Sequence, residues 1–161
     1  MCDWLRGINS DINIKYTVFE TKQISSEYGQ YSKEIGIDFR DINLLKDHKF
    51  DLIIISGTLQ YTKDWEQIIN TSLQNAPIVL LMRVPLIDSL KNEYFIQHFS
   101  TGLYGESSSS WPVIFFAKDK FIEKVKELSE IQFSGIDYEE SFPFNGRKCY
   151  VSSYLLKSKL V

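Results

Sequence analysis

The sequence predicts an α/β protein built on an open, largely parallel β-sheet. Three observations favour this class: apolar runs of strand length alternate with amphipathic segments of helix length, the run at residues 52–55 is unbroken and branched, and an antiparallel strand pair closes the chain. The 161 residues, 43% hydrophobic and 24% charged, fit a single globular domain over residues 1–161.

The first third of the chain is expected to form three strands and one surface helix. Residues 14–19 predict a strand that ends at Glu20, and residues 37–40 predict a second short strand. The polar residues 25–35 suit a surface helix, closed by Gly36 as a left-handed cap. Residues 50–56 contain the branched apolar run, which predicts a central, parallel strand covered on both faces.

An amphipathic helix and a buried strand are expected next. Asp64 is placed to cap the helix, which should end near Asn75 because Pro77 blocks its continuation. The inner stripe of this helix follows three- and four-residue spacings: Trp65, Ile68, Ile69 and Leu73. Residues 78–84 predict a buried strand that Pro85 stops, because proline cannot donate to the ladder.

The remainder of the chain divides into a loop, a helix and a hairpin. Residues 86–112 lose the periodic pattern, which predicts a long loop serving as a lid. Residues 118–129 predict a helix, and residues 131–138 and 148–156 alternate like the strands of an antiparallel hairpin.

Charge, hydropathy and cysteine content exclude several classes. A formal net charge of −3 and a pI of about 5.4 supply no cationic field, so nucleic acid is not an expected partner. No apolar run approaches the roughly 20 residues that span a bilayer. The first residues lack the pattern of a secretory signal, so we expect a cytoplasmic location. Cys2 and Cys149 stand apart without a Cys/His cluster, so no metal site is indicated.

The residues that end the strands carry the candidate chemistry, because ligands of open α/β sheets bind beyond the carboxyl ends of the strands. Glu20 can accept both hydroxyls of a ribose, the alternative being a solvated acid. Asp41 can reach an adenine amino group while Ile42 packs on the ring, although a turn-forming aspartate is an equal interpretation.

The bend after residues 50–56 is the second candidate region. Ser56 and Gly57 close this strand, and Gly57 would let the backbone approach a bound ligand closely. Tyr61 can stack or hydrogen-bond in the same pocket, or else belong to the core. No G-x-G-x-x-G or related glycine cluster precedes Glu20, which disfavours a dinucleotide or nucleotide-sugar enzyme.

Several segments share their order and spacing with one known family: residues 16–20 (YTVFE), 50–61 (FDLIIISGTLQY), 83–85 (RVP), Gln97, 104–105 (YG) and 111–112 (WP). On these segments the chain resembles a family of methyltransferases whose genes often sit among those for lipopolysaccharide and other surface polysaccharides. The resemblance implies a Rossmann-like class I methyltransferase sheet in the order 3-2-1-4-5-7-6, with strand 7 antiparallel. The chain would supply strands 2–7 without strand 1 and its glycine loop, as an N-terminally incomplete domain.

The same resemblance implies S-adenosylmethionine as the cofactor and methyl transfer to a small-molecule or sugar acceptor, in surface-polysaccharide biosynthesis. The cofactor would then be held by Glu20, Asp41, Ile42, Ser56, Gly57 and Tyr61. The residues expected to contact the acceptor are Arg83, Gln97 and Tyr104, because an arginine at a strand end can fork onto an anionic sugar or phosphate. His98 is the candidate base for a hydroxyl acceptor, or else a surface residue.

A second hypothesis belongs to a different class. The chain could be a non-catalytic methyltransferase-like fragment, or a partner-binding module, that has lost cofactor binding. Without strand 1, two buried strands would carry unpaired backbone groups. Direct pairing of strands 2 and 4, or a strand donated by a second chain as in a homodimer, would compensate.

Overall fold

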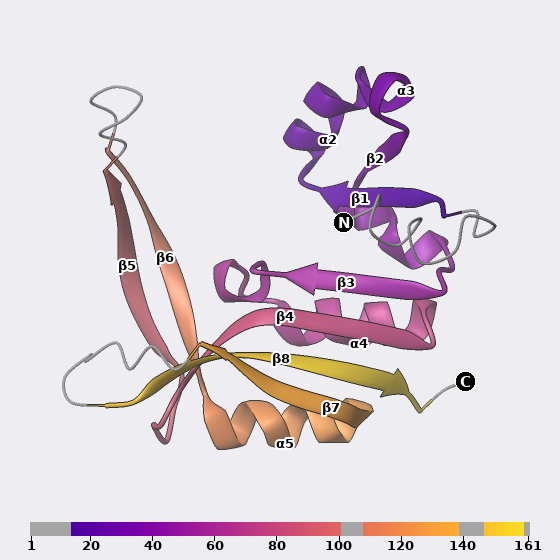
Figure 1. Ribbon diagram of the computed structural model, residues 1–161. Helices are drawn as coiled ribbons and strands as arrows, with labels where there is room; N and C mark the ends of the chain where they lie inside the picture. The colour runs from indigo at the N-terminus through magenta and orange to yellow at the C-terminus, as the bar shows by residue number, and fades with distance from the viewer. Residues whose placement is uncertain (1–13, 101–107, 139–146, 160–161) are drawn as a thin grey trace. The chain divides into compact units, whose positions relative to one another are not determined.

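The computed structural model describes residues 14–100, 108–138 and 147–159. The chain divides into two compact units, Met1–His48 and Lys49–Val161. Within the described residues, each unit contains its own β-sheet, with two strands in the first and six in the second (Figure 1).

The first unit consists of two parallel strands and their connecting helices. In chain order its elements are β1 (Tyr16–Glu20), α2 (Lys22–Gly29), α3 (Ser32–Ile35), β2 (Ile37–Asp41) and the 3-10 helix η1 (Ile42–Asp47). The two strands pair in parallel, and the last residues of each, Glu20 and Asp41, stand opposite one another. Both predicted strands are therefore confirmed.

The single helix expected over residues 25–35 is wrong in its extent, because the structure has two helices there. The hydroxyl of Thr21 accepts from the backbone N–H of Ile24 (3.4 Å), so α2 begins three residues earlier than expected. It ends at Gly29, a residue that disfavours helix. The left-handed cap predicted at Gly36 is confirmed, with φ of 68°.

The second unit is a mixed sheet with two helices. In chain order its elements are β3 (Leu52–Ser56), the 3-10 helix η2 (Leu59–Tyr61), α4 (Trp65–Asn75), β4 (Ile78–Ile87), β5 (Glu93–Ser100), β6 (Ser108–Ala117), α5 (Lys118–Leu128), β7 (Ser129–Tyr138) and β8 (Cys149–Ser158). β4 pairs in parallel with β3 and antiparallel with β8, and β8 pairs antiparallel with β7. The order β3-β4-β8-β7 corresponds to the 4-5-7-6 half of the predicted sheet, so this fold class is confirmed.

β4 continues past the proline that was expected to stop it. Its pairing with β3 ends at Met82, and its pairing with β6 covers Leu86 and Ile87. Pro85 lies in the interval between these two ladders, and a residue without an N–H is tolerated where a ladder is interrupted. The prediction that the strand ends before Pro85 is therefore wrong.

The long loop predicted over residues 86–112 is also wrong. Within that segment, residues 93–100 form β5 and residues 108–112 begin β6, and the two strands pair antiparallel from Glu93 opposite Phe115 to Ser100 opposite Ser108. In Figure 1 this hairpin projects from the end of β4. The sequence did not reveal it because Tyr94, Phe95 and Ile96 are apolar in succession and give no two-residue alternation.

β3 is parallel, as predicted, but it is not covered on both faces. Among the described strands it pairs with β4 alone, so within them it lies at an edge of its sheet and not at the centre, where it was expected. Leu52 is 44% exposed, whereas Ile55 is buried. The continuous apolar run therefore has one covered face and one partly open face.

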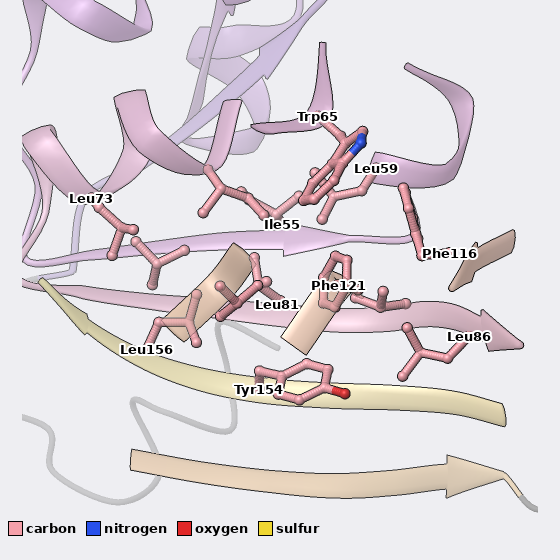
Figure 2. Packing of buried hydrophobic residues seen from close by; sticks show 14 of the residues in the cluster. Ile55, Leu59, Trp65, Leu73, Leu81, Leu86, Phe116, Phe121, Tyr154 and Leu156 are labelled. Atoms are coloured by element: carbon pink, nitrogen blue, oxygen red, sulfur yellow. The ribbon is translucent and has the colours of Figure 1, made fainter. Parts of the chain in front are cut away.

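The core of the second unit lies between one face of its sheet and the two helices α4 and α5. Figure 2 shows the central side chains of this core meeting from the helices and from β6 and β8. The ring of Phe121 lies 5.2 Å from those of Trp65 and Phe116 and 5.8 Å from that of Tyr154, measured between centroids. Burial raises the pKa of Tyr154. Asp64 stands at the N-terminus of α4 as predicted, although its side chain makes no capping hydrogen bond.

Within residues 14–100, 108–138 and 147–159, no helix is long and apolar enough to cross a membrane.

Candidate functional site

Two carboxylates end the strands of the first unit. Glu20 is half-buried, and its carboxylate has no hydrogen bond or ion pair to another described residue. Asp41 also is half-buried, and its Oδ1 accepts from the backbone N–H (3.0 Å) and the side-chain amide (2.9 Å) of Asn43. Asp41 thus caps η1, which supports its interpretation as a turn residue. The Glu20 carboxylate, in contrast, can accept hydrogen bonds from a ligand.

Ile42 is the first residue of η1 and is half-buried. It therefore lies next to the Asp41 carboxylate at the end of β2, the position from which an apolar side chain can cover one side of a planar ring.

The bend after β3 is a tight backbone turn. Gly57 has φ of 60°, a conformation that residues with a Cβ rarely adopt, and its N–H donates to the carbonyl of Met82 (3.0 Å). A Cβ at this position would meet no atom closer than Nε2 of Gln60, at 3.9 Å. The backbone conformation, and not a close approach of the surrounding chain, therefore accounts for this glycine. The carbonyl of Ser56 accepts from the hydroxyl of Thr58 (3.1 Å).

Gln60 adds a polar group to which the sequence analysis gave no role in the site. Its Oε1 is buried, and no described group donates a hydrogen bond to it. Buried polar atoms are nearly always hydrogen-bonded, so this oxygen next to Gly57 is suited to receive a donor from a ligand. The sequence around Gln60 does not indicate that its side-chain oxygen is buried without a hydrogen-bond donor.

Tyr61 connects the bend to the β5–β6 hairpin. Its hydroxyl donates to Oε1 of Gln97 on β5 (3.0 Å), and its side chain is 46% exposed. Opposite Gln97 on β6 stands Trp111, which is 38% exposed. Tyr61 is therefore not a core residue, and the structure brings it together with Gln97, both of which were sequence candidates.

Arg83 lies in an irregularity of β4. Leu81 stands opposite Tyr154 and Val84 opposite Ser152, so Met82 and Arg83 share Ser153 as a single opposite residue, which defines a β-bulge. Arg83 has φ of 59°, the one described non-glycine residue with positive φ. Its backbone N–H donates to Oδ2 of Asp137 (3.3 Å), and its side chain is exposed. The sequence suggested Arg83 but gave no indication of Asp137.

His98 does not join the group around Tyr61. It lies on β5 directly after Gln97, and successive side chains of a strand point to opposite faces. Its Nδ1 is 2.7 Å from the hydroxyl of Ser110, the residue opposite it on β6. Tyr104, the third candidate for acceptor contacts, lies outside the described residues.

Surface depressions and metal-binding clusters offer no competing site in the described part of the chain. Two shallow depressions lie over α5 and between α4 and α5, and no predicted site residue lines either of them. No three His, Cys, Asp or Glu side chains of residues 14–100, 108–138 and 147–159 gather as ligands of a metal ion would.

Comparisons with known proteins give one kind of match. No protein-family model matches the chain, and no curated protein matches its sequence. Among solved structures, the N-terminal domain of EvdMO1, crystallised with S-adenosylhomocysteine (SAH) and D-fucose, has a TM-score of 0.59 at 9% identity and aligns with 89% of this chain. The glycopeptide N-methyltransferase MtfA has a TM-score of 0.53 at 12% identity, over 87% of this chain. The chain shares its fold with these two proteins, one of which is a methyltransferase.

A third neighbour supports the same assignment of fold. The PH0226 protein of Pyrococcus horikoshii has a TM-score of 0.57 at 8% identity, over 96% of this chain. Rossmann-like sheets of this kind bind their ligands at the carboxyl ends of the strands. This chain spans 66% of the EvdMO1 domain, 73% of MtfA and 76% of PH0226, so the fold is shared over most but not all of their lengths.

Proposed function

We propose that this chain binds S-adenosylmethionine at the carboxyl ends of its strands, as part of a methyltransferase that acts on a small-molecule or sugar acceptor. The observation that carries the proposal is the half-buried carboxylate of Glu20, which ends β1 without a partner among the described residues, in a fold shared with SAH-bound proteins. A carboxylate at the end of this strand is suited to accept both ribose hydroxyls.

Other strand-end residues have complementary roles. Asp41 retains Oδ2 for an adenine amino group, since its two hydrogen bonds to Asn43 use Oδ1, and Ile42 covers the ring. At the bend after β3, Gly57 and Ser56 present backbone groups, while Gln60 offers its unpaired buried oxygen. The pair Asp41 and Ile42 matches an adenine base, which is planar, largely apolar on its faces and polar at its edges.

The acceptor side is assigned to the second unit. Gln97 and Arg83 supply an amide and a guanidinium, with Tyr104 as a further candidate, and Tyr61, which is proposed to contact the cofactor, holds Gln97 through the hydrogen bond from its hydroxyl. Two neighbours support a glycosylated acceptor, since one was crystallised with D-fucose and another is a glycopeptide N-methyltransferase. A role in surface-polysaccharide biosynthesis is part of this proposal and rests on the family resemblance of the sequence.

The residues act mainly by positioning. S-adenosylmethionine supplies a methyl group on a sulfonium, which is electrophilic without further activation. Gln97, fixed by Tyr61, orients an acceptor group by hydrogen bonding, and such alignment lowers the barrier of an in-line transfer. His98 lies on the other face of β5, so it serves as the base only for an acceptor reaching that face.

We further propose that both units belong to one methyltransferase-like domain in a cytoplasmic protein. The alignment of 89% of the chain with a single EvdMO1 domain supports the first point. A homodimer in which a second copy supplies a strand is consistent with the edge of β3 that has no described partner.

A non-catalytic module is the second candidate function. It is favoured by the absence of a glycine-rich motif before Glu20 in the sequence, since such a loop normally holds the methionine end of the cofactor. The two candidates differ in one measurable property, which is affinity for S-adenosylmethionine and SAH.

Isothermal titration calorimetry with SAH distinguishes the two. The wild-type chain is expected to bind, and Glu20→Ala to weaken binding by about 10- to 100-fold, because hydrogen bonds to a charged group contribute about 1.5–3 kcal/mol. Glu34→Ala removes an exposed acid of α3 in the same unit and should leave affinity unchanged. An absence of heat with both SAH and S-adenosylmethionine would establish the non-catalytic module instead.

A further inference from the structure

We propose that Arg83 is an anion-binding residue and that Asp137 is the positioning residue that holds its backbone in the left-handed conformation. This inference rests on the proposed function and deepens it, because it assigns a negatively charged group, such as a phosphate or carboxylate, to the acceptor.

The first observation is the backbone of Arg83. Its φ of 59° lies in the left-handed region, which is unfavourable for a residue that carries a Cβ. Bulges that require this conformation usually contain glycine, which adopts it freely. An arginine retained in such a position indicates that its side chain serves a purpose, since backbone strain of this kind clusters at functional sites.

The second observation is the device that holds this conformation. Asp137 is itself the extra residue of a bulge in β7, because Ile136 stands opposite Ser152 and Tyr138 opposite Val151. Its Oδ2 accepts from the hydroxyl of Ser153 on β8 (2.6 Å) and from the backbone N–H of Arg83 on β4 (3.3 Å). One carboxylate therefore connects two bulges across three strands.

The third observation concerns the guanidinium. Among the arginines of the described residues, Arg40 pairs with Asp38 and Arg147 pairs with Glu93, whereas the exposed guanidinium of Arg83 has no hydrogen-bond or ion-pair partner among these residues. A planar guanidinium with five donors matches the oxygens of a phosphate or carboxylate in a bidentate arrangement.

The position of this arginine relates the anion to the proposed site. Met82, the residue before Arg83, accepts from the N–H of Gly57 at the bend after β3. The bulge therefore adjoins the bend at which the cofactor is proposed to bind, and an anion on Arg83 would lie on the acceptor side of it.

The test is a titration of the whole chain with inorganic phosphate, followed by NMR of the arginine Nε–Hε signals. The chain has four arginines, Arg6, Arg40, Arg83 and Arg147, and loss of one signal in Arg83→Lys assigns the relevant one. We expect the Arg83 signal to shift saturably, while those of the ion-paired Arg40 and Arg147 stay unchanged as internal controls.

Variants of Asp137 and Ser153 distinguish a role in positioning Arg83 from a general role in stability. Asp137→Ala is expected to weaken phosphate affinity by about tenfold, and Asp137→Asn to recover most of it, because an amide oxygen still accepts both hydrogen bonds. Ser153→Ala, which removes one hydrogen bond to Asp137, should weaken it by about threefold and carries the test if Asp137→Ala does not fold.

Arg83→Gly tests the strain itself. Glycine adopts the left-handed conformation freely, so this variant should unfold at a higher urea concentration than the wild type while losing the phosphate response. The proposal is overturned if phosphate does not shift the Arg83 signal. It is also overturned if the folded Asp137 and Ser153 variants bind phosphate with wild-type affinity, or if Arg83→Gly unfolds at a lower urea concentration than the wild type. Phosphate binding without SAH binding would count against the proposed function and not against this inference.

Discussion

Gly57 illustrates how one residue shapes the end of a strand. Its φ of 60° turns the chain sharply after β3, and the hydrogen bond from its N–H to Met82 fixes that turn against β4. The turn places Gln60 and Tyr61 in η2 immediately beyond the strand end. Glycine is needed here for its backbone freedom, while the neighbouring side chains provide the polar groups.

Gly57→Ala is expected to lower the free energy of unfolding by about 1–2 kcal/mol, because a Cβ is disfavoured in the left-handed region. Urea denaturation followed by circular dichroism measures the change. Gly29→Ala is the matched control: a Cβ there meets no atom within 4 Å, and the residue is helical, so stability should be unchanged or slightly raised. Equal midpoints for Gly57→Ala and the wild type would show that the turn tolerates a side chain.

At the scale of residues, the sequence located some of the candidate site residues and missed others for a definable reason. Glu20 and Gly57 end strands that have strong local patterns, so their positions followed from periodicity. Asp137 did not, because its role depends on bulges in β4 and β7 that arise from the register of three strands far apart in sequence. Local patterns do not contain that register.

The elements of the second unit are organised by a pair of helices that meet over one face of the sheet. Trp65 of α4 and Phe121 of α5 stack at 5.2 Å, and Lys124 of α5 pairs with Glu66 of α4 (3.3 Å). The strands contribute their inward residues to the same cluster, including Leu81 and Tyr154 (Figure 2). This packing holds the end of β3, and thus the bend at Gly57, in place.

Phe121→Ala should therefore destabilise the second unit strongly, by about 3–5 kcal/mol, through lost burial and a cavity among aromatic rings. Phe133→Ala removes the same side chain from β7, where it is 63% exposed, and should change stability by less than about 0.5 kcal/mol. Chemical denaturation of both variants gives the comparison. A similar loss in each would mean that the helix pair is not the centre of the core.

The helices and strands that could be predicted from the sequence are those with one apolar and one polar side. α4, α5 and the β7–β8 hairpin were expected because each buries one side and exposes the other. The β5–β6 hairpin was missed because apolar side chains on both of its strands are exposed: Tyr94 and Ile96 on β5 and Trp111 on β6. Their exposure removes the alternation of buried apolar and exposed polar residues that marks a strand. The continuation of β4 past Pro85 was missed because the interval between its two ladders is a property of the sheet.

In the whole molecule, the strands form two separate sheets whose orders correspond to two parts of the class I methyltransferase sheet. β2-β1 corresponds to the 3-2 part, and β3-β4-β8-β7 to the 4-5-7-6 part. Periodicity predicted the strands and their alternation with helices, whereas the strand order came from the family resemblance. Among the described residues, the edges of β1 and β3 that would flank strand 1 have no partner strand.

The central claim is that the carboxyl ends of these strands hold an adenosine moiety, and mapping SAH onto the backbone by two-dimensional NMR tests it most directly. We predict saturable shifts of the amide signals of Glu20, Asp41, Gly57 and Tyr61 on addition of SAH, with the amides of α5 unchanged. Unchanged spectra at saturating SAH, or shifts confined to the depression between α4 and α5, would contradict the account.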